Sequence, residues 1–162
     1  MSARDSPVGA RAPLQVLVLP YRTSRVLELA MFRRVDADVW QFVAGGGVVG
    51  ESVEQSARRE GFEEAAIPTD AVYHRLASQG SVPVECFEAR ETWPSGLTHV
   101  PEYCFAVEMS GRIELSREHD RFEWLGVDAA LERLTFESNR RAAMELRMRL
   151  VEGRLSLSPA TP

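Results

Sequence analysis

Three glutamates near the middle of the chain are spaced so that they could hold a metal ion together. Glu60 and Glu64 are four positions apart and Glu63 lies beside them, in the stretch GGGVVGESVEQSARREGFEEAAI at residues 45–67. Side chains three or four positions apart are neighbours on an α-helix. Like charges at that spacing repel one another by roughly a few tenths of a kcal/mol, and a divalent cation would offset the repulsion. The pattern therefore indicates a metal-binding catalytic helix.

The ligand types favour Mg²⁺, with Mn²⁺ as a substitute, over Zn²⁺. Carboxylate oxygens are hard ligands, and residues 45–67 include neither cysteine nor histidine. An arginine held against one carboxylate would orient it and leave the others for the metal, and Arg59 with Glu51 could form such a pair. A solvated acidic face is the ordinary interpretation of such a helix. Here the preceding glycines, the arginine and the spacing favour the metal site.

The glycines before the helix match a dinucleotide-binding pattern that we reject. Gly45, Gly47 and Gly50 satisfy G-x-G-x-x-G, and Asp70 lies twenty residues beyond Gly50. A dinucleotide site needs a second buried strand that ends at the acidic residue, and no such strand precedes Asp70. A Walker A loop is excluded because no Gly-Lys-Ser/Thr follows. We instead expect a glycine-rich loop that leads into a helix capped by Ser52.

The stretch resembles the Nudix box, G-x5-E-x7-R-E-U-x-E-E-x-G-U, in which U is a bulky apolar residue. The residues that fall in register are Gly45, Glu51, Arg59, Glu60, Glu63, Glu64 and Ile67. Gly61 replaces a bulky apolar residue of the box, at a cost of about 1 kcal/mol in helix propensity, and Ala66 replaces its second glycine. Neither departure removes a charged group. The resemblance implies the α/β/α sandwich of Nudix hydrolases, with a mixed central sheet and a catalytic loop-helix.

Motifs outside the box are similar to those of the bacterial dihydroneopterin triphosphate pyrophosphohydrolases, which also act on dATP. They are Arg33-Arg34, Asp38-x-Trp40-Gln41-x-Val43-x-Gly45, Trp93-Pro94-x-Gly96-Leu97-Thr98, Glu118-His119, Trp124-Leu125 and Ser138-Asn139-Arg140. By this resemblance the metal ligands include Glu60, Glu64 and Glu118. The implied substrate contacts are Arg11, Arg33, Ala44 and Asn139. Ala44 replaces a hydroxyl-bearing residue of that group, so selectivity for the base or pterin can differ.

The implied chemistry is hydrolysis of a phosphoanhydride. Metal ions would neutralise phosphate oxygens, lower the pKa of bound water and hold the water in line. We expect two or more Mg²⁺ ions on Glu60, Glu63, Glu64 and Glu118, and a (deoxy)nucleoside or dihydroneopterin triphosphate cleaved to a monophosphate and pyrophosphate. Glu51 would orient Arg59. The general base is left open among Glu63, Glu102 and Glu118.

Other functions stay open at this point. Within enzymes, the chain could remove oxidised or noncanonical nucleoside triphosphates, or cleave a nucleoside diphosphate linked to another group. A rival of another class is a non-catalytic Nudix-like module that binds a nucleotide or a protein. Degenerate boxes of such modules lack their glutamates, whereas this box keeps all of them.

Composition indicates an ordinary globular protein. The chain has 162 residues, of which 44% are hydrophobic and 27% charged, and its formal net charge is −5. This charge disfavours nonspecific nucleic-acid binding. No run approaches the roughly 18 apolar residues of a membrane span, and the N-terminal residues lack the apolar core of a secretion signal. The two cysteines have no metal-ligand spacing, so we expect them to be reduced in a cytoplasmic protein. The oligomeric state is not indicated.

The periodicity predicts one Nudix domain at residues 13–152, with a flexible arm at 1–12 and a flexible tail at 153–162. Strands are expected at 14–20, 25–32, 39–44, 71–76, 82–89, 103–109 and 122–125. The first two should form a hairpin. A turn is expected at 78–81 and a long loop, which could act as a lid, at 90–101. Helices are expected at 127–134 and 137–151.

Overall fold

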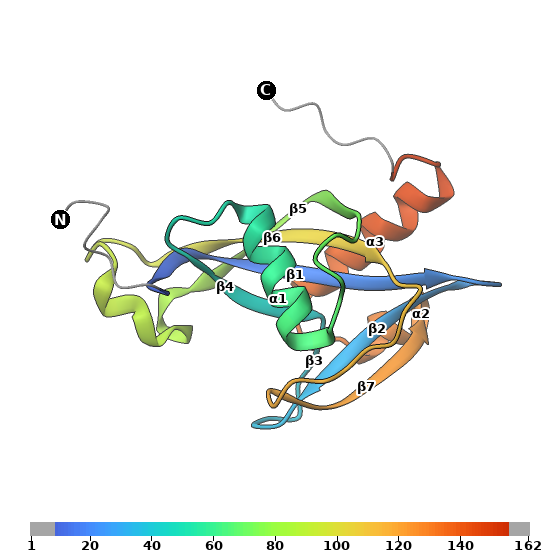
Figure 1. The fold of residues 1–162 in the computed structure, drawn as a ribbon, viewed down its shortest axis with the longest axis horizontal. Helices are drawn as coiled ribbons and strands as arrows, with labels where there is room; N and C mark the ends of the chain where they lie inside the picture. Colours follow the sequence, from blue (N-terminus) through green and yellow to red (C-terminus); the bar gives the residue numbers. More distant parts are fainter. Residues whose placement is uncertain (1–8, 156–162) are drawn as a thin grey trace.

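The structure is a computed structural model that describes residues 9–155. Within these residues a 7-stranded mixed sheet lies between helices on both faces, with α1 on one face and α2 and α3 on the other (Figure 1). The strands are β1 (Arg11–Thr23), β2 (Leu27–Arg34), β3 (Trp40–Gln41), β4 (Val43–Val48), β5 (Tyr73–Pro83), β6 (His99–Glu108) and β7 (His119–Gly126). The helices are α1 (Val53–Ala65), α2 (Val127–Arg133) and α3 (Glu137–Val151), with short 3₁₀ turns η1 (Val84–Cys86) and η2 (Glu88–Thr92). This is the α/β/α sandwich that the sequence predicts.

Strand β1 runs through the centre of the sheet and changes partner along its length. One edge pairs in parallel with β6 from Gln15 to Tyr21. The other edge pairs antiparallel with β4 as far as Val18 and with β2 from Tyr21 onward, which confirms the predicted hairpin. The sheet therefore forks near Pro20, a residue that has no backbone N–H to offer at the gap.

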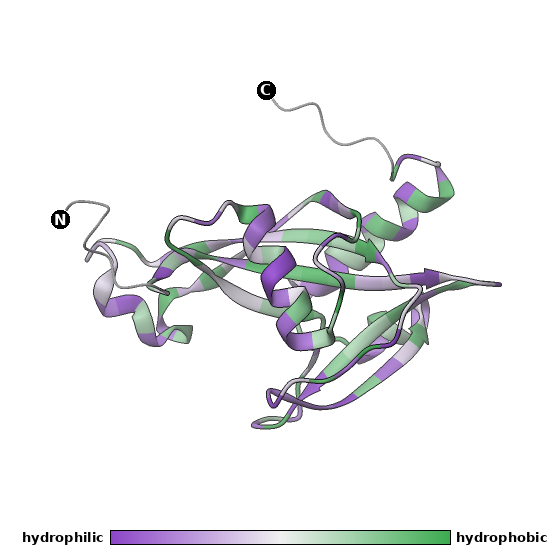
Figure 2. Ribbon diagram, in the orientation of Figure 1, coloured by the Kyte–Doolittle hydropathy of each residue, from purple (hydrophilic) through white to green (hydrophobic). Residues whose placement is uncertain are grey.

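Alternation along β1 divides the core into two layers. Val16 and Val18 pack in the layer against α1, and Leu17 and Leu19 in the layer against α3. All four are fully buried. Successive side chains of a strand point to opposite faces, so a continuous apolar run fits a strand that is covered on both sides. In the ribbon of Figure 2, the central strands are largely in the apolar colour, and the helices carry both colours.

Helix α1 explains one of the two departures from the box, and the structure gives no reason for the other. Its start is a capping box in which the Ser52 side chain accepts from the Gln55 backbone N–H. A Cβ atom at Gly61 would lie 2.1 Å from Tyr73 Oη, so the bulky residue of the box cannot fit against this tyrosine. The helix ends at Ala66 with φ 56, a left-handed conformation that a glycine adopts more easily.

Four predicted segments differ from the structure. The expected glycine loop is mostly strand, because Gly45 and Gly46 pair with β1. The expected turn at 78–81 lies inside β5, where a register shift between Arg75 and Gln79 accommodates the polar residues on an edge strand. The expected strand at 82–89 ends at Pro83 and continues as 3₁₀ turns. Part of the expected loop at 90–101 is η2 and the start of β6.

The ordered domain also extends beyond its predicted limits. Strand β1 includes Arg11 and Ala12 of the predicted arm. Leu155 of the predicted tail is 7% exposed and packs in the core layer against α3. The rest of the predicted arm and tail, at 1–8 and 156–162, lies outside the described residues. No helix in the described part of the chain is long and apolar enough to cross a membrane.

Candidate active site

Two adjoining cavities of about 660 Å³ each open beside the N-terminal half of β1 and share the wall residues Ala44, Cys86 and Glu118. We call the first the carboxylate cavity; its other walls include Arg11, Gly45, Gly46, Glu60 and Glu64. We call the second the amide cavity; its other walls include Gln15, Gln41, Glu102, Ser138 and Asn139. Together they form a site with a part lined by Glu60, Glu64 and Glu118, and a second part where amide and hydroxyl groups lie among charged residues that include Arg34, Arg117 and Glu102.

Glu60 is held at the wall of the carboxylate cavity by a glycine and two arginines. A Cβ atom at Gly45 would lie 2.0 Å from Glu60 Cδ, so β4 needs a glycine here for the carboxyl group to fit. Glu60 Oε1 lies 2.7 Å from Arg59 Nη1 and 3.6 Å from Arg11 Nη1. Burial raises the pKa of Glu60, and the hydrogen bond from Arg59 opposes that rise. The carboxylate is therefore only partly compensated.

Glu64 is the acidic group of the site whose ionised form is most disfavoured by its surroundings. Its residue is 3% exposed, and Oε2 is buried with no hydrogen-bond partner among the described residues. Burial, followed by the charges of Glu60 and Glu118, raises its pKa to about 10. A buried carboxylate of this kind is stabilised by a cation beside it. The donor set therefore fits a divalent metal ion.

Glu118 reaches this group from a loop far along the chain, whereas Glu63 does not reach it. Glu118 lines both cavities, and its carboxyl group raises the pKa of Glu64 by charge and by a hydrogen bond. Its backbone carbonyl accepts from Val35 N at 3.0 Å. The Glu63 side chain is 55% exposed, lines neither cavity and lies 3.5 Å from Arg59 Nη1.

The carboxylates do not yet form a complete ligand shell. Within residues 9–155, no three carboxylate, imidazole or thiol groups are arranged as a ready metal site. Glu60 is paired with Arg59, and Glu63 faces solvent on the same helix.

Arg59 braces the helix against β4. Its Nε donates to Glu51 Oε1 at 2.7 Å, and its Nη2 donates to Glu51 Oε2 at 3.1 Å and to Gly46 O at 2.9 Å. Ser56 Oγ also donates to Glu51 Oε2, at 2.7 Å. The hydrogen bond from Arg59 lowers the pKa of Glu51, and the same pair raises the pKa of Arg59. Glu51 and Arg59 are thus occupied with each other and with β4.

His119 is a buried residue of the site to which the sequence assigned no role. It is 3% exposed, and its Nδ1 lies 3.9 Å from Glu64 Oε2 with no hydrogen-bond partner in the described structure. Its Nε2 lies 3.5 Å from Gln41 Nε2. Burial lowers the pKa of His119, which favours the neutral ring. Its place next to Glu118 in the shared motif was the available signal.

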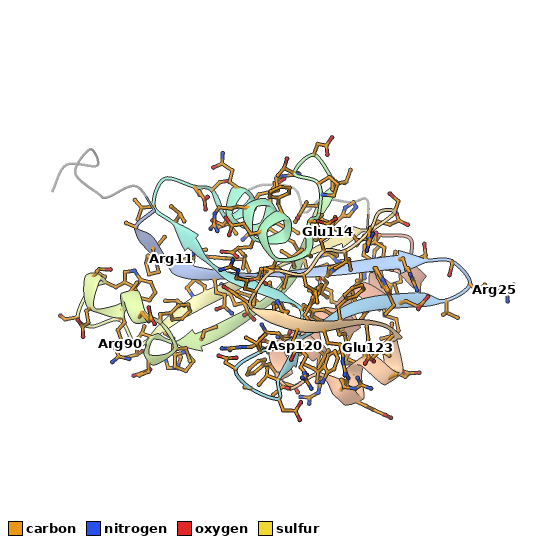
Figure 3. All side chains as sticks on the ribbon, turned by 60° about the horizontal axis from the view of Figure 1, so that its bottom comes forward. Arg11, Arg25, Arg90, Glu114, Asp120 and Glu123 are labelled. Carbon is orange, nitrogen blue, oxygen red and sulfur yellow. The ribbon has the colours of Figure 1, made fainter. Side chains whose placement is uncertain are left out.

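The two consecutive arginines at the end of β2 separate in space. Arg33, the predicted substrate contact, lines neither cavity and pairs with Asp120 at 2.7 and 3.0 Å (Figure 3 labels Asp120). Arg34 lines the amide cavity instead. Neighbouring residues of a strand point to opposite faces, so the sequence alone could not say which arginine faces the site.

Glu102 lies on the wall of the amide cavity and not in the carboxylate cavity, so the structure does not group it with Glu60 and Glu64. Its oxygens accept from Gln15 Nε2 and, at 2.9 Å, from Ser138 Oγ. Asn139, a predicted substrate contact, lies on the same wall and is 2% exposed. Asn139 Oδ1 accepts from Phe42 N at 3.0 Å, which fixes the orientation of its amide.

Arg11 connects the carboxylate cavity to the segment that covers it. Its Nη1 donates to Gly46 O at 3.2 Å, and its backbone carbonyl accepts from Trp93 Nε1 at 2.9 Å. The Trp93 ring packs on Phe87 with the ring centroids 5.3 Å apart. Figure 3 shows Arg11 near the covering segment that carries Arg90. The 3₁₀ segment predicted as part of a strand and a loop thus forms a wall of the site.

Comparison with known proteins adds family information to this geometry. A model of the NUDIX domain matches residues 12–146. Dihydroneopterin triphosphate diphosphatase of Escherichia coli is 33% identical over 138 residues, which covers 82% of this chain and 90% of that enzyme. A crystal structure from Listeria monocytogenes that is named for a NUDIX hydrolase has a TM-score of 0.80 at 36% identity, covering 89% of this chain and 98% of that one. The structure of the E. coli dihydroneopterin triphosphate pyrophosphohydrolase has a TM-score of 0.71 at 26% identity, covering 87% and 99%.

Proposed function

The chain belongs to the Nudix family of hydrolases, and we propose that it is a Mg²⁺-dependent pyrophosphohydrolase of a (deoxy)nucleoside or dihydroneopterin triphosphate. The products would be a monophosphate and pyrophosphate. The observation that carries the proposal is the buried, incompletely compensated Glu64 beside Glu60 and Glu118, in a cavity that adjoins a second one large enough for a heterocyclic ring. The name of the E. coli relative supports this substrate class.

Under this proposal, the residues of the carboxylate cavity bind the metal ions and the phosphate chain. Glu60, Glu64 and Glu118 would hold the metal ions, with Glu63 joining them by rotation. When bound, Mg²⁺ neutralises phosphate charge and acidifies a water molecule. Arg11 would contact the phosphate chain from the cavity wall, and Arg59 with Glu51 would keep the catalytic helix in register with β4.

The placement of the acidic groups supports a shorter set of candidates for the general base. Glu118 lines both cavities and Glu63 faces solvent on the catalytic helix, so each can reach water. Glu102 lies away from the carboxylate cavity, and we assign it no proton transfer. The proposal therefore retains Glu63 and Glu118 as bases. The amide cavity would hold the ring through Asn139 and the wall at Ala44.

A substrate panel with product analysis tests this function. The purified chain would be incubated with dihydroneopterin triphosphate, the four dNTPs, an oxidised dNTP and ADP-ribose, with Mg²⁺, with Mn²⁺ and with EDTA. We expect pyrophosphate and a monophosphate from at least one triphosphate, and no turnover in EDTA. Turnover confined to ADP-ribose or to the oxidised nucleotide would favour the narrower hydrolases considered above. Binding without turnover of any compound would favour a non-catalytic module.

A further inference from the structure

Glu102 is a buried carboxylate for which phosphate hydrolysis offers no use. It is 3% exposed, yet both of its hydrogen bonds come from neutral groups, the Gln15 amide and the Ser138 hydroxyl. None of the ion pairs formed among residues 9–155 includes Glu102. Burying a carboxylate without a cationic partner is costly. The fold nevertheless keeps it on the wall of the amide cavity.

The surroundings of Glu102 are shaped to hold its carboxyl group in one place. Glu102 pairs across the sheet with Gln15 of β1 on one side and with Gly80 of β5 on the other. A Cβ atom at Gly80 would lie 2.7 Å from Glu102 Oε1 and 3.1 Å from the Ser138 Cβ. A glycine is therefore needed at position 80 for this carboxylate to sit beside α3. Three strands and a helix fix the two oxygens.

The fixed carboxylate still has acceptor capacity for a ligand. A carboxylate offers about four lone-pair sites, two on each oxygen. The Ser138 hydroxyl donates to Oε1 and the Gln15 amide donates to Oε2. Each oxygen therefore keeps one lone pair that can accept a further hydrogen bond. Two parallel acceptors match a ligand edge that presents two adjacent N–H donors.

Heterocyclic rings differ in whether they have an edge with two adjacent N–H donors. A 2-amino-4-oxo ring, as in guanine and pterin, presents a ring N–H next to an exocyclic amino group. Adenine and cytosine present one amino group next to a ring nitrogen acceptor, whose lone pair would face a carboxylate oxygen. Thymine presents one N–H between two carbonyl oxygens. Only the first pattern gives two hydrogen bonds with Glu102 and no repulsion.

We propose that Glu102, positioned by Gln15 and Ser138, is a specificity-determining residue that selects triphosphates whose ring presents two adjacent N–H donors. This inference rests on the proposed function, since the ring must enter the amide cavity while its phosphate chain extends past Ala44 toward Glu60 and Glu64. Guanine and pterin triphosphates would then be preferred to adenine triphosphates.

The Glu102→Gln variant tests the proposal by a ratio of substrates. Glutamine keeps the size of the side chain but places an amino donor against the donors of the ring. The kcat/KM for dGTP and dihydroneopterin triphosphate, divided by that for dATP, should fall about 10- to 100-fold, which is the usual worth of hydrogen bonds to a charged group. Glu108→Gln is the matched control, because Glu108 is an exposed glutamate of the same strand that lines neither cavity. It should leave the ratio unchanged.

Two results would overturn the proposal. An unchanged ratio in Glu102→Gln would show that the carboxylate does not read the ring. An equal loss of kcat on all triphosphates, which also leaves the ratio unchanged, would show that Glu102 supports turnover in general and does not select the ring. Should the variant fail to fold, Ser138→Ala removes one tether of the carboxylate, and the same ratio should fall by a smaller factor.

A binding measurement separates this inference from the proposed hydrolysis. GMP and AMP would be titrated into the parent protein and into Glu102→Gln in EDTA, by calorimetry. The parent should bind GMP about tenfold more tightly than AMP, and the variant should lose the difference. Preferential binding of GMP without hydrolysis of any triphosphate would refute the proposed function and uphold the role of Glu102. Hydrolysis with equal binding of GMP and AMP would do the reverse.

Discussion

The two cavities lie side by side and bury their carboxylates in different ways. In the carboxylate cavity, Glu64 has a buried oxygen with no hydrogen-bond partner in the described structure and a pKa raised to about 10. In the amide cavity, both oxygens of Glu102 accept a hydrogen bond. A bound cation would offset the cost of the first arrangement, and under our proposal the second receives the N–H donors of the substrate ring. The two cavities would then serve charge neutralisation and ring recognition separately.

The largest effect is expected from a substitution that changes the carboxylate cavity and leaves the amide cavity intact. Glu64→Gln keeps the size of the side chain but removes the charge that would hold Mg²⁺, and kcat should fall about a thousandfold or more, because metal stabilisation is worth several kcal/mol. Pyrophosphate release at saturating Mg²⁺ measures it. Glu54→Gln is the control, since Glu54 faces outward from the same helix and pairs with Arg58 at 2.7 Å. Near-parental turnover in Glu64→Gln would contradict the assignment of the cavity.

The second prediction concerns pH and the same residue. The folded pKa of Glu64 lies above its unfolded value, so ionising it opposes folding from about pH 4.5 upward toward pH 10. In EDTA, the free energy of unfolding should therefore fall between pH 5 and 8 by up to a few kcal/mol. Added Mg²⁺ should restore it, and more so at pH 8 than at pH 5. Urea titrations of the parent and of Glu64→Gln measure the difference.

The variant provides the control for that pH series. Glu64→Gln should lose most of the pH dependence, because glutamine does not ionise. If the free energy of unfolding changed equally with pH in the parent and the variant, the pH dependence would come from carboxylates other than Glu64. The comparison between the two cavities would then lose its physical basis.

The third prediction tests the support of the catalytic helix. Gly61→Val should destabilise the protein by about 1–3 kcal/mol, since its Cβ would meet Tyr73 Oη at 2.1 Å. Combining it with Tyr73→Phe, which removes that oxygen, should recover part of the loss, as thermal unfolding would measure. Additive effects of the two substitutions would mean that the contact does not explain the glycine.

The smallest effect concerns the end of the same helix. Ala66→Gly should stabilise the protein by about 1 kcal/mol, because glycine adopts the left-handed conformation at φ 56 without the Cβ penalty. Urea denaturation would measure the shift. Ala65→Gly is the matched control and should destabilise, since Ala65 lies within α1 and is fully buried. A loss of stability in Ala66→Gly would count against the strained cap.

The sequence predicts the carboxylate cavity better than the amide cavity. Glu60 and Glu64 of the carboxylate cavity come from one helix, so their spacing in the chain already gives their positions in space. The amide cavity brings together β1, β6 and α3, which only the folded sheet places side by side. For this reason the reaction class could be predicted, while the placement of Glu102 could not.

Errors in the predicted elements have a similar origin. The polar segment at 78–81 predicts a turn by composition, but its pairing with β6 keeps it extended. The choice between Arg33 and Arg34 depends on which face of β2 turns toward the cavities. His119 was given no role, although it belongs to the shared motif with Glu118, because its contact with Glu64 exists only after folding.

Strand β1 runs along both cavities. Arg11 contributes to the carboxylate cavity and Gln15 to the amide cavity, and both belong to this one strand. Four residues of strand span roughly 13 Å, so the ring end and the phosphate end of the site are held at a set separation, with a register shift between these two residues to adjust it. Under the proposed function, this separation would set how many phosphates lie between the ring and the metal site.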